Sequence, residues 1–296
     1  MTEKDKICYI RPKRALRRLK AAEEENITAY IYGVSGIGKT ELIVRYLKQK
    51  KYQMFDAGRV SAEELEGIAE SEKRKIVVID NLHDLAMEED YEDIKEAIIS
   101  LIEREDVWLI LSGRCAVPPW LAAVRYREVF YVIEESELLF DEAQENQYIE
   151  YTKILLTPEQ REASSHYCLG VPLGWYITWD IYKQIRLREG LKEGEYFSDE
   201  LFSELIDRGL SQMWDYLDWH VYDNWDIRIQ EFLMEVSIVD CFTAHLAEMI
   251  TGRNNVESIL SRVKWIGNFM VERTEKDEVV YEFRREMRIS MRRRLK

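Results

Sequence analysis

The 296-residue sequence predicts an α/β domain with a five-stranded parallel sheet, followed by a small helical domain and a winged-helix domain. Three observations predict this order. In the first half, short β-branched runs alternate with amphipathic segments, which is typical of a parallel sheet flanked by helices. After about residue 135 the hydrophobic period becomes helical almost throughout. The last part reads as three helices followed by a β-hairpin, which is the order of a winged helix. We therefore expect domains at 1–135, 136–190 and 191–296.

The first domain is expected to contain five strands with helices in the connections between them. The predicted strands are 28–32, 52–56, 76–79, 107–112 and 128–133. The predicted helices are 40–48, 61–70 and 91–103. In the second of these helices, Ser61 and Glu64 have the spacing of a capping box.

The rest of the chain is predicted to be helical until the final hairpin. One helix begins near Asp141, and another begins at Thr157-Pro158, where an N-cap residue precedes proline at the first helical position, and ends at Gly170. The further predicted helices are 173–187, 199–220, 227–236, 243–250 and 256–265, with a charged linker at 188–196. The hairpin strands are predicted at 269–273 and 278–283.

The net charge of −14 is unevenly distributed. Residues 1–20 and residues 284–296 each carry +6, so the remaining body carries −26, and this balance excludes a generally basic nucleic-acid coat. The basic final segment is expected to form a helix whose apolar line, Met287, Met291 and Leu295, docks on a following domain. No apolar run approaches the roughly 20 residues of a membrane span, and the N-terminus lacks a signal peptide. We expect a soluble, cytoplasmic protein with no membrane partner.

Residues 33–40 (GVSGIGKT) fit the phosphate-binding pattern GxxxxGK[ST] between a predicted strand and a predicted helix. The glycines allow the backbone to curl so that its N–H groups point at phosphate oxygens, and the helix adds its positive end. Lys39 is expected to reach the β- and γ-phosphates, and the Thr40 hydroxyl to ligate Mg²⁺. The candidate nucleotide-binding residues in this segment are Gly33, Ser35, Gly36, Ile37, Gly38, Lys39, Thr40 and Glu41.

Two further strands deliver side chains to the same edge of the sheet. Asp80 follows a buried apolar strand and is the expected second Mg²⁺ ligand. Asn81 stands where a second acid would orient the attacking water, and since an amide cannot act as a base, slow or absent hydrolysis is expected unless Asp84 or another residue substitutes. Arg114, after the strand 107–112, is placed to pair with a γ-phosphate. Lys39, Asp80 and Arg114 are the candidate catalytic residues.

Taken together, these motifs resemble the STAND class of signal-transduction NTPases, and within it the ATP-dependent LuxR-type transcriptional regulators similar to MalT. The resemblance covers nearly the whole chain. It rests on Arg11-Pro12, GVSGIGKT at 33–40, VVIDNLHDL at 77–85, WLILSGRCAVPPWL at 108–121 and LGVPL at 169–173.

The resemblance implies ATP or ADP, with Mg²⁺, clamped between the three domains. It implies that Pro172 borders the adenine and that the loop around Arg11 and Pro12 closes the other side of the base. It also implies a closed form held by ADP and an open form, favoured by ATP and an inducer, that self-associates.

The sequence departs from this class at three points. Asn81 replaces a second aspartate, Arg284-Arg285 replaces a histidine pair that follows the hairpin, and the sequence ends at Lys296, where such regulators continue into a sensor and a DNA-binding helix-turn-helix. We therefore expect the N-terminal portion of a longer regulator or a stand-alone switch, with DNA reached only through a domain absent from this chain.

Two other functions stay open on the sequence. A P-loop enzyme such as a kinase would need an acceptor pocket and an arginine-rich lid. A winged-helix DNA-binding module with a vestigial nucleotide site would need a basic third helix, whereas residues 256–265 offer only Arg262 and Lys264.

Overall fold

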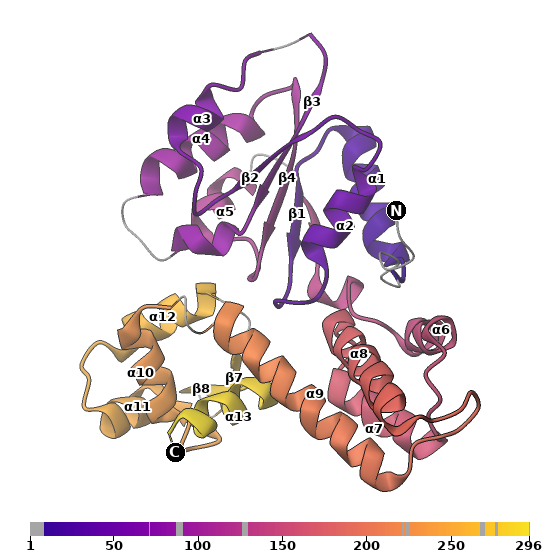
Figure 1. The fold of residues 1–296 in the computed structure, drawn as a ribbon. Coiled ribbons are helices and arrows are strands. Elements are labelled where there is room, and N and C mark those ends of the chain that lie inside the picture. Colours follow the sequence, from indigo (N-terminus) through magenta and orange to yellow (C-terminus); the bar gives the residue numbers. More distant parts are fainter. Residues whose placement is uncertain are drawn as a thin grey trace.

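The computed structural model describes residues 9–70, 72–86, 91–125, 130–220, 222, 225–266, 270–275 and 278–295. Figure 1 shows a twisted sheet with helices on both faces, a group of helices beside one end of it, and a winged helix beside the same end. One long helix, α9 (Asp199–His220), runs between the two smaller parts. The predicted fold class is confirmed.

The sheet consists of five parallel strands in the order β2-β3-β4-β1-β5. They are β1 (Ala29–Tyr32), β2 (Gln53–Asp56), β3 (Lys75–Asp80), β4 (Val107–Gly113) and β5 (Tyr131–Ile133). The register places Asp56 opposite Asp80 and Ile79 opposite Leu111. Because all strands are parallel, the residues that follow them gather at one edge, and the site lies there.

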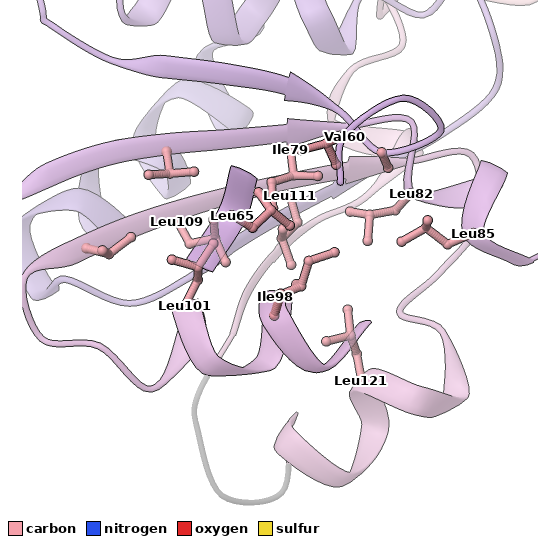
Figure 2. Packing of buried hydrophobic residues seen from close by; sticks show 14 of the residues in the cluster. Val60, Leu65, Ile79, Leu82, Leu85, Ile98, Leu101, Leu109, Leu111 and Leu121 are labelled. Atoms are coloured by element: carbon pink, nitrogen blue, oxygen red, sulfur yellow. The ribbon is translucent and has the colours of Figure 1, made fainter. Parts of the chain in front are cut away.

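The period of two along each strand supplies two separate cores. One face of the sheet, with Val78 and Trp108, packs against α1 (Lys13–Glu25) and α2 (Lys39–Tyr46). The other face packs against α3 (Ala62–Glu66), α4 (Glu92–Ile102) and α5 (Pro119–Arg125). Figure 2 shows its interdigitated side chains, among them Leu65, Ile79, Ile98, Leu101, Leu111 and Leu121.

The small helical part comprises α6 (Glu142–Thr152), α7 (Pro158–Cys168) and α8 (Pro172–Glu189). Asp141 and Thr157 form capping boxes at the starts of α6 and α7, as side-chain oxygens satisfy N–H groups that lack a helical partner. Trp175 of α8 is fully buried, and its indole N–H donates to Glu145 Oε1 at 3.0 Å, which ties α8 to α6.

In the part of the chain that the structure describes, the winged helix contains four helices and a three-stranded antiparallel sheet in the order β6-β8-β7. Its elements are α10 (Ile227–Val236), β6 (Cys241–Thr243), α11 (Ala244–Thr251), α12 (Val256–Ile266), β7 (Met270–Glu275), β8 (Glu278–Phe283) and α13 (Arg285–Arg294). Phe232, Phe242 and Phe283 lie in its core.

Several boundaries differ from the sequence predictions. The capping box of Ser61 and Glu64 is present, but α3 ends at Glu66. Helices α1 and α5 and strand β6 were not predicted. Dense Lys and Arg hide the apolar stripe of α1, and a three-residue strand has too few positions to show a period. Residues 126–129 and 267–269, at the predicted starts of two strands, lie outside the described residues.

The expectation for the final helix is wrong in one respect. Met287 and Met291 do not face outward toward a following domain. They are 4% and 0% exposed and belong to the core of the winged helix. Leu295, at the end of the same line, is exposed. A short amphipathic helix looks the same in sequence whether its apolar side is covered by its own domain or by another.

The basic segments pair with the acidic body. Arg288 and Arg292 contact Asp240 at 3.1 and 2.9 Å. At the other end of the chain, Arg18 contacts Glu137 at 3.0 Å. Within the described residues, no helix combines the length and the apolar character needed to cross a bilayer.

Candidate functional site

The glycine-rich loop between β1 and α2 adopts the curl that its sequence predicts. Gly36 and Gly38 have φ values of 84° and 95°, in the left-handed region that glycine occupies without strain. A Cβ on Gly36 would lie only 2.6 Å from Leu173 Cδ2, so the loop also needs a glycine there for α8 to approach. The Leu173 N–H donates to the Gly36 carbonyl at 3.3 Å, which brings Pro172 beside the loop.

Lys39 lies across the loop at the first turn of α2. Its Nζ donates to the carbonyl oxygens of Gly33 at 2.7 Å and Val34 at 3.1 Å. Burial lowers the pKa of the Lys39 ammonium to about 8, with Asp80 opposing the shift and Arg114 adding to it. The cation is therefore placed at the loop with little solvent around it, where an anion is favoured strongly.

Thr40 and Asp80 are in direct contact. Thr40 Oγ1 donates to Asp80 Oδ2 at 2.7 Å, and the other carboxylate oxygen accepts from the Ser112 hydroxyl and, at 2.9 Å, from the Asn81 N–H. Asp80 is only 6% exposed. A hydroxyl and a carboxylate side by side at a phosphate loop are hard oxygen ligands, so this donor set fits Mg²⁺.

Arg114 and Ser35 both contact α9. Arg114 Nη2 donates to the main-chain carbonyl of His220 at 3.0 Å, and Ser35 Oγ lies 3.0 Å from the Tyr216 hydroxyl. The rings of Tyr216 and His220 lie 4.6 Å apart. The last turn of α9 is thus held from two sides by residues of the phosphate loop and the strand edge.

Glu135 is a site residue that the sequence analysis missed. It follows β5 on the short 3₁₀ helix η4 (Glu135–Glu137) and is 9% exposed. Its Oε2 accepts from the Val34 N–H of the phosphate loop at 3.0 Å, and its Oε1 accepts from Arg284 of the winged helix at 2.9 Å. Arg284, which replaces a histidine of the class that the sequence resembles, thus has its guanidinium on Glu135.

Asp56 is the second missed residue. It ends β2, and its carboxylate accepts from Asn81 Nδ2 at 2.8 Å and from the Gly58 N–H at 3.1 Å. Asn81 has a φ of 62°, a left-handed conformation that asparagine tolerates better than most residues. The signal for both missed residues was the one used for Asp80, namely an acid at the carboxyl end of a strand.

A cavity of about 1140 Å³ opens over this edge of the sheet. Of the predicted residues it is lined by Ser35, Gly36, Gly38, Lys39, Thr40, Glu41 and Arg114. Asp56, Asp84, Tyr216 and His220 also line it. The cavity therefore brings together the phosphate loop, the ends of β2 to β4 and the end of α9.

The other predicted residues lie outside that lining. Ile37 is 2% exposed in the core, so it can offer only its main chain. Glu41 does line the cavity, but its carboxylate pairs with Arg45. Pro12 is buried at the start of α1, and the Arg11 carbonyl accepts from Gln144 of α6 at 3.3 Å. Arg11 and Pro12 thus lie next to the small helical part, to which Pro172 belongs.

His83, which follows Asp80 by three residues, is buried at 8% exposure on the 3₁₀ helix η2 (Leu82–Ala86). Burial, reinforced by the charges of Arg114 and Lys39, lowers the pKa of His83 to about 2. An imidazole with so low a pKa is a poor proton acceptor at neutral pH, so His83 does not suit the role of a base.

The pKa of Lys39 predicts how nucleotide binding depends on pH. Below about pH 8 the ammonium is charged, and above it the side chain must take up a proton to bind phosphate. The affinity for ADP should therefore fall by about tenfold between pH 7.5 and 9, where phosphate is already fully ionised. Titration with a fluorescent ADP analogue at both pH values measures this, and an unchanged affinity would contradict the contact.

The sheet order, the phosphate loop and the Thr40–Asp80 pair define a fold of the P-loop NTPase class. A Walker-type ATPase of Pyrococcus abyssi has this fold, with a TM-score of 0.67 and 13% identity over 96% of each chain. A RuvB point mutant of Thermotoga maritima matches with a TM-score of 0.54 and 13% identity over 94% of each chain. A STAND protein of Pyrococcus horikoshii with a tetratricopeptide repeat sensor matches at 0.42 and 15% identity, over 96% of this chain and 42% of that one.

Residues 218–296 match the model of the MalT winged helix domain. The chain therefore joins a P-loop ATPase fold to a MalT winged helix domain, and the resemblance inferred from the sequence motifs is confirmed to that extent. A search of the curated proteins finds no match.

Proposed function

We propose that this chain is a nucleotide-dependent switch in transcriptional regulation, which binds ATP or ADP with Mg²⁺ and hydrolyses ATP slowly at most. One observation carries the proposal: the last turn of α9 is fixed by Ser35 of the phosphate loop and by Arg114 at the strand edge. Since α9 leads directly into the winged helix, groups that would meet the phosphates also hold the position of that domain.

The chemistry of each side chain indicates which part of the nucleotide it would contact. The amides of residues 33–40 and the Lys39 ammonium would hold the phosphates, and Thr40 and Asp80 would ligate Mg²⁺. The adenine would lie between Pro172 and the segment Arg11-Pro12. This placement is supported by the contact of Leu173 with Gly36, and by Ile10, which is buried in the helical core together with Trp175.

ATP and ADP differ in the charge they would present to Arg114. The guanidinium donates one hydrogen bond to the His220 carbonyl, and a γ-phosphate offers a fully charged acceptor in its place. ATP would thereby weaken the hold on α9, while ADP would leave it intact. This supplies the difference in affinity between two states that a ligand-driven population shift requires.

In this proposal the winged helix packs against the sheet domain of its own chain and does not bind DNA. Helix α12, the third helix of the winged helix and the one that would have to be basic to bind DNA, packs against η2 of the sheet domain, and its Lys264 pairs with Glu272 at 2.8 Å. DNA contact would come through a domain absent from this chain. An inducer would stabilise the ATP form, and that form would self-associate once the winged helix is released.

The nucleotide content of the purified protein tests the proposal. Denaturing the protein and separating the released nucleotides should yield ADP in nearly equal amount to protein, because a closed site retains its ligand. A protein that releases no nucleotide and binds none when ADP and Mg²⁺ are added would overturn the switch. A DNA-binding module with a vestigial site would give that result.

A further inference from the structure

We propose that Asp56 supplies the water-orienting carboxylate that Asn81 cannot provide, so that the chain hydrolyses ATP slowly. The inference rests on the proposed nucleotide site and adds a reaction to it. In the sequence, Asn81 stands at the position where an acid would orient the attacking water, so that acid is missing. The structure shows a carboxylate in contact with that position from the neighbouring strand.

The strand register brings Asp56 to the right edge of the sheet. Asp56 and Asp80 are partners on the parallel strands β2 and β3, so their Cα atoms are about 5 Å apart. Asp80 contacts Thr40, and Asp56 lines the same cavity as Lys39 and Thr40. A water beside a phosphate at the loop therefore has this carboxylate in the wall around it.

Two hydrogen bonds hold the Asp56 carboxylate in one orientation. Asn81 Nδ2 donates to Oδ2 at 2.8 Å, and the Gly58 N–H donates to Oδ1 at 3.1 Å. Each oxygen keeps a second lone pair, so each can still accept a hydrogen bond from water. The left-handed backbone of Asn81 and the bond of its N–H to Asp80 keep the amide directed at β2. Asn81 in this arrangement positions Asp56.

Asp84 and His83 also line the cavity wall, and each is weaker as a candidate base. The Asp84 carboxylate lies 3.5 Å from His83 Nε2, a longer contact than either of the two bonds that fix Asp56. His83 is buried and neutral. Of Asp56 and Asp84, Asp56 is therefore the carboxylate that hydrogen bonds fix more closely.

The reaction balances with water and ATP alone. The water oxygen forms a bond to the γ-phosphorus, and the bond from that phosphorus to the β,γ-bridging oxygen breaks, with its electron pair leaving on ADP. Asp56 accepts the proton that water loses and returns it to solvent. The products are ADP and inorganic phosphate, so the reaction would convert the proposed open form to the closed one.

Hydrolysis and binding are measured separately in the test. The variants are Asp56→Asn, the swap Asp56→Asn with Asn81→Asp, and Asp84→Asn, which removes the rival carboxylate. Asp93→Asn, on the exposed side of α4, is the matched control. ATP affinity is measured in the presence of Mg²⁺, and phosphate release is followed at saturating ATP. Phosphate release by Lys39→Ala gives the background rate.

Asp56→Asn should lower kcat at least tenfold and leave the Kd for ATP within about twofold, since the amide keeps the shape and the bond to Gly58. The double variant Asp56→Asn with Asn81→Asp should recover turnover, because position 81 then supplies the carboxylate that position 56 has lost. Asp93→Asn should hydrolyse like the unchanged protein, because Asp93 is exposed on α4 and is not among the residues that line the cavity. Asp84→Asn should lower kcat less than Asp56→Asn does.

Three results would overturn the role of Asp56. They are turnover in the unchanged protein no faster than the Lys39→Ala background, full turnover in Asp56→Asn, and loss of turnover in Asp84→Asn alone. Each is compatible with normal nucleotide binding, so the proposed switch would survive it. Absence of binding in the unchanged protein would overturn both.

Discussion

Replacing Lys39 with alanine is expected to leave the purified protein without bound nucleotide. The ammonium lies across the phosphate loop with little solvent around it, and hydrogen bonds from charged groups contribute about 1.5–3 kcal/mol each. Loss of one or two such bonds to phosphate should weaken ADP binding by roughly 100-fold or more. Analysis of the nucleotide released on denaturation, together with calorimetric titration of ADP, measures the effect.

The fold should survive this change. Burial lowers the pKa of Lys39, so its charge is less stable in the folded protein than in the unfolded chain at pH 7, and its removal relieves that cost. The matched control is Lys48→Ala, because Lys48 is an exposed lysine just beyond the end of α2. The control should retain nucleotide, and a Lys39→Ala protein with unchanged ADP content would remove the phosphate-loop assignment.

Replacing Arg284 with alanine is expected to loosen the winged helix from the sheet domain. Arg284 pairs with Glu135, and Glu135 accepts the Val34 N–H of the phosphate loop, so a single carboxylate links the two parts. Removal of one partner of a buried pair leaves the other charge uncompensated. Because the arginine side chain is 37% exposed, solvent screens the pair, and the free energy lost from the contact between the two parts should be only about 1–2 kcal/mol.

That cost should appear as faster ADP release, by about five- to thirtyfold, and as greater protease sensitivity between α9 and α10. Stopped-flow displacement of a fluorescent ADP analogue measures the release rate. Arg262→Ala serves as the control, since Arg262 lies exposed on α12 of the same domain. Equal release rates in Arg284→Ala and the control would show that the ion pair does not hold the closed form.

A paired variant refines this result. Glu135→Gln keeps an acceptor for the Val34 N–H and removes only the charge, so it should loosen the winged helix without damage to the phosphate loop. Adding Glu135→Gln to Arg284→Ala should then increase ADP release little further, because the two residues act through one contact.

Where chemistry follows from neighbours in sequence, the prediction was close. The phosphate loop, Asp80 and Arg114 lie at the predicted edge of the sheet, because a fixed spacing or a strand end places each of them and every strand of a parallel sheet ends at the same edge. The capping residues Ser61 and Thr157 were predicted for a similar reason, since a cap acts within one turn. Asp141 was predicted only as the start of a helix, and the structure shows that it also forms a capping box.

Other features depend on which segments pack together. The contact of Asp56 with Asn81 required β2 to lie beside β3, and the contact of Glu135 with Arg284 joins residues 149 positions apart. Met287 and Met291 formed a visible apolar line, but only packing decided that their own domain covers it.

The sequence by itself determined the class of fold and the phosphate loop, because a repeated local period and a short glycine pattern are enough to specify them. Tertiary structure alone decided which acid stands beside Asn81, which carboxylate receives Arg284, and that the end of α9 rests on Ser35 and Arg114. The physical reason is that strand order and domain docking are set by the summed burial of many side chains, which no single segment encodes.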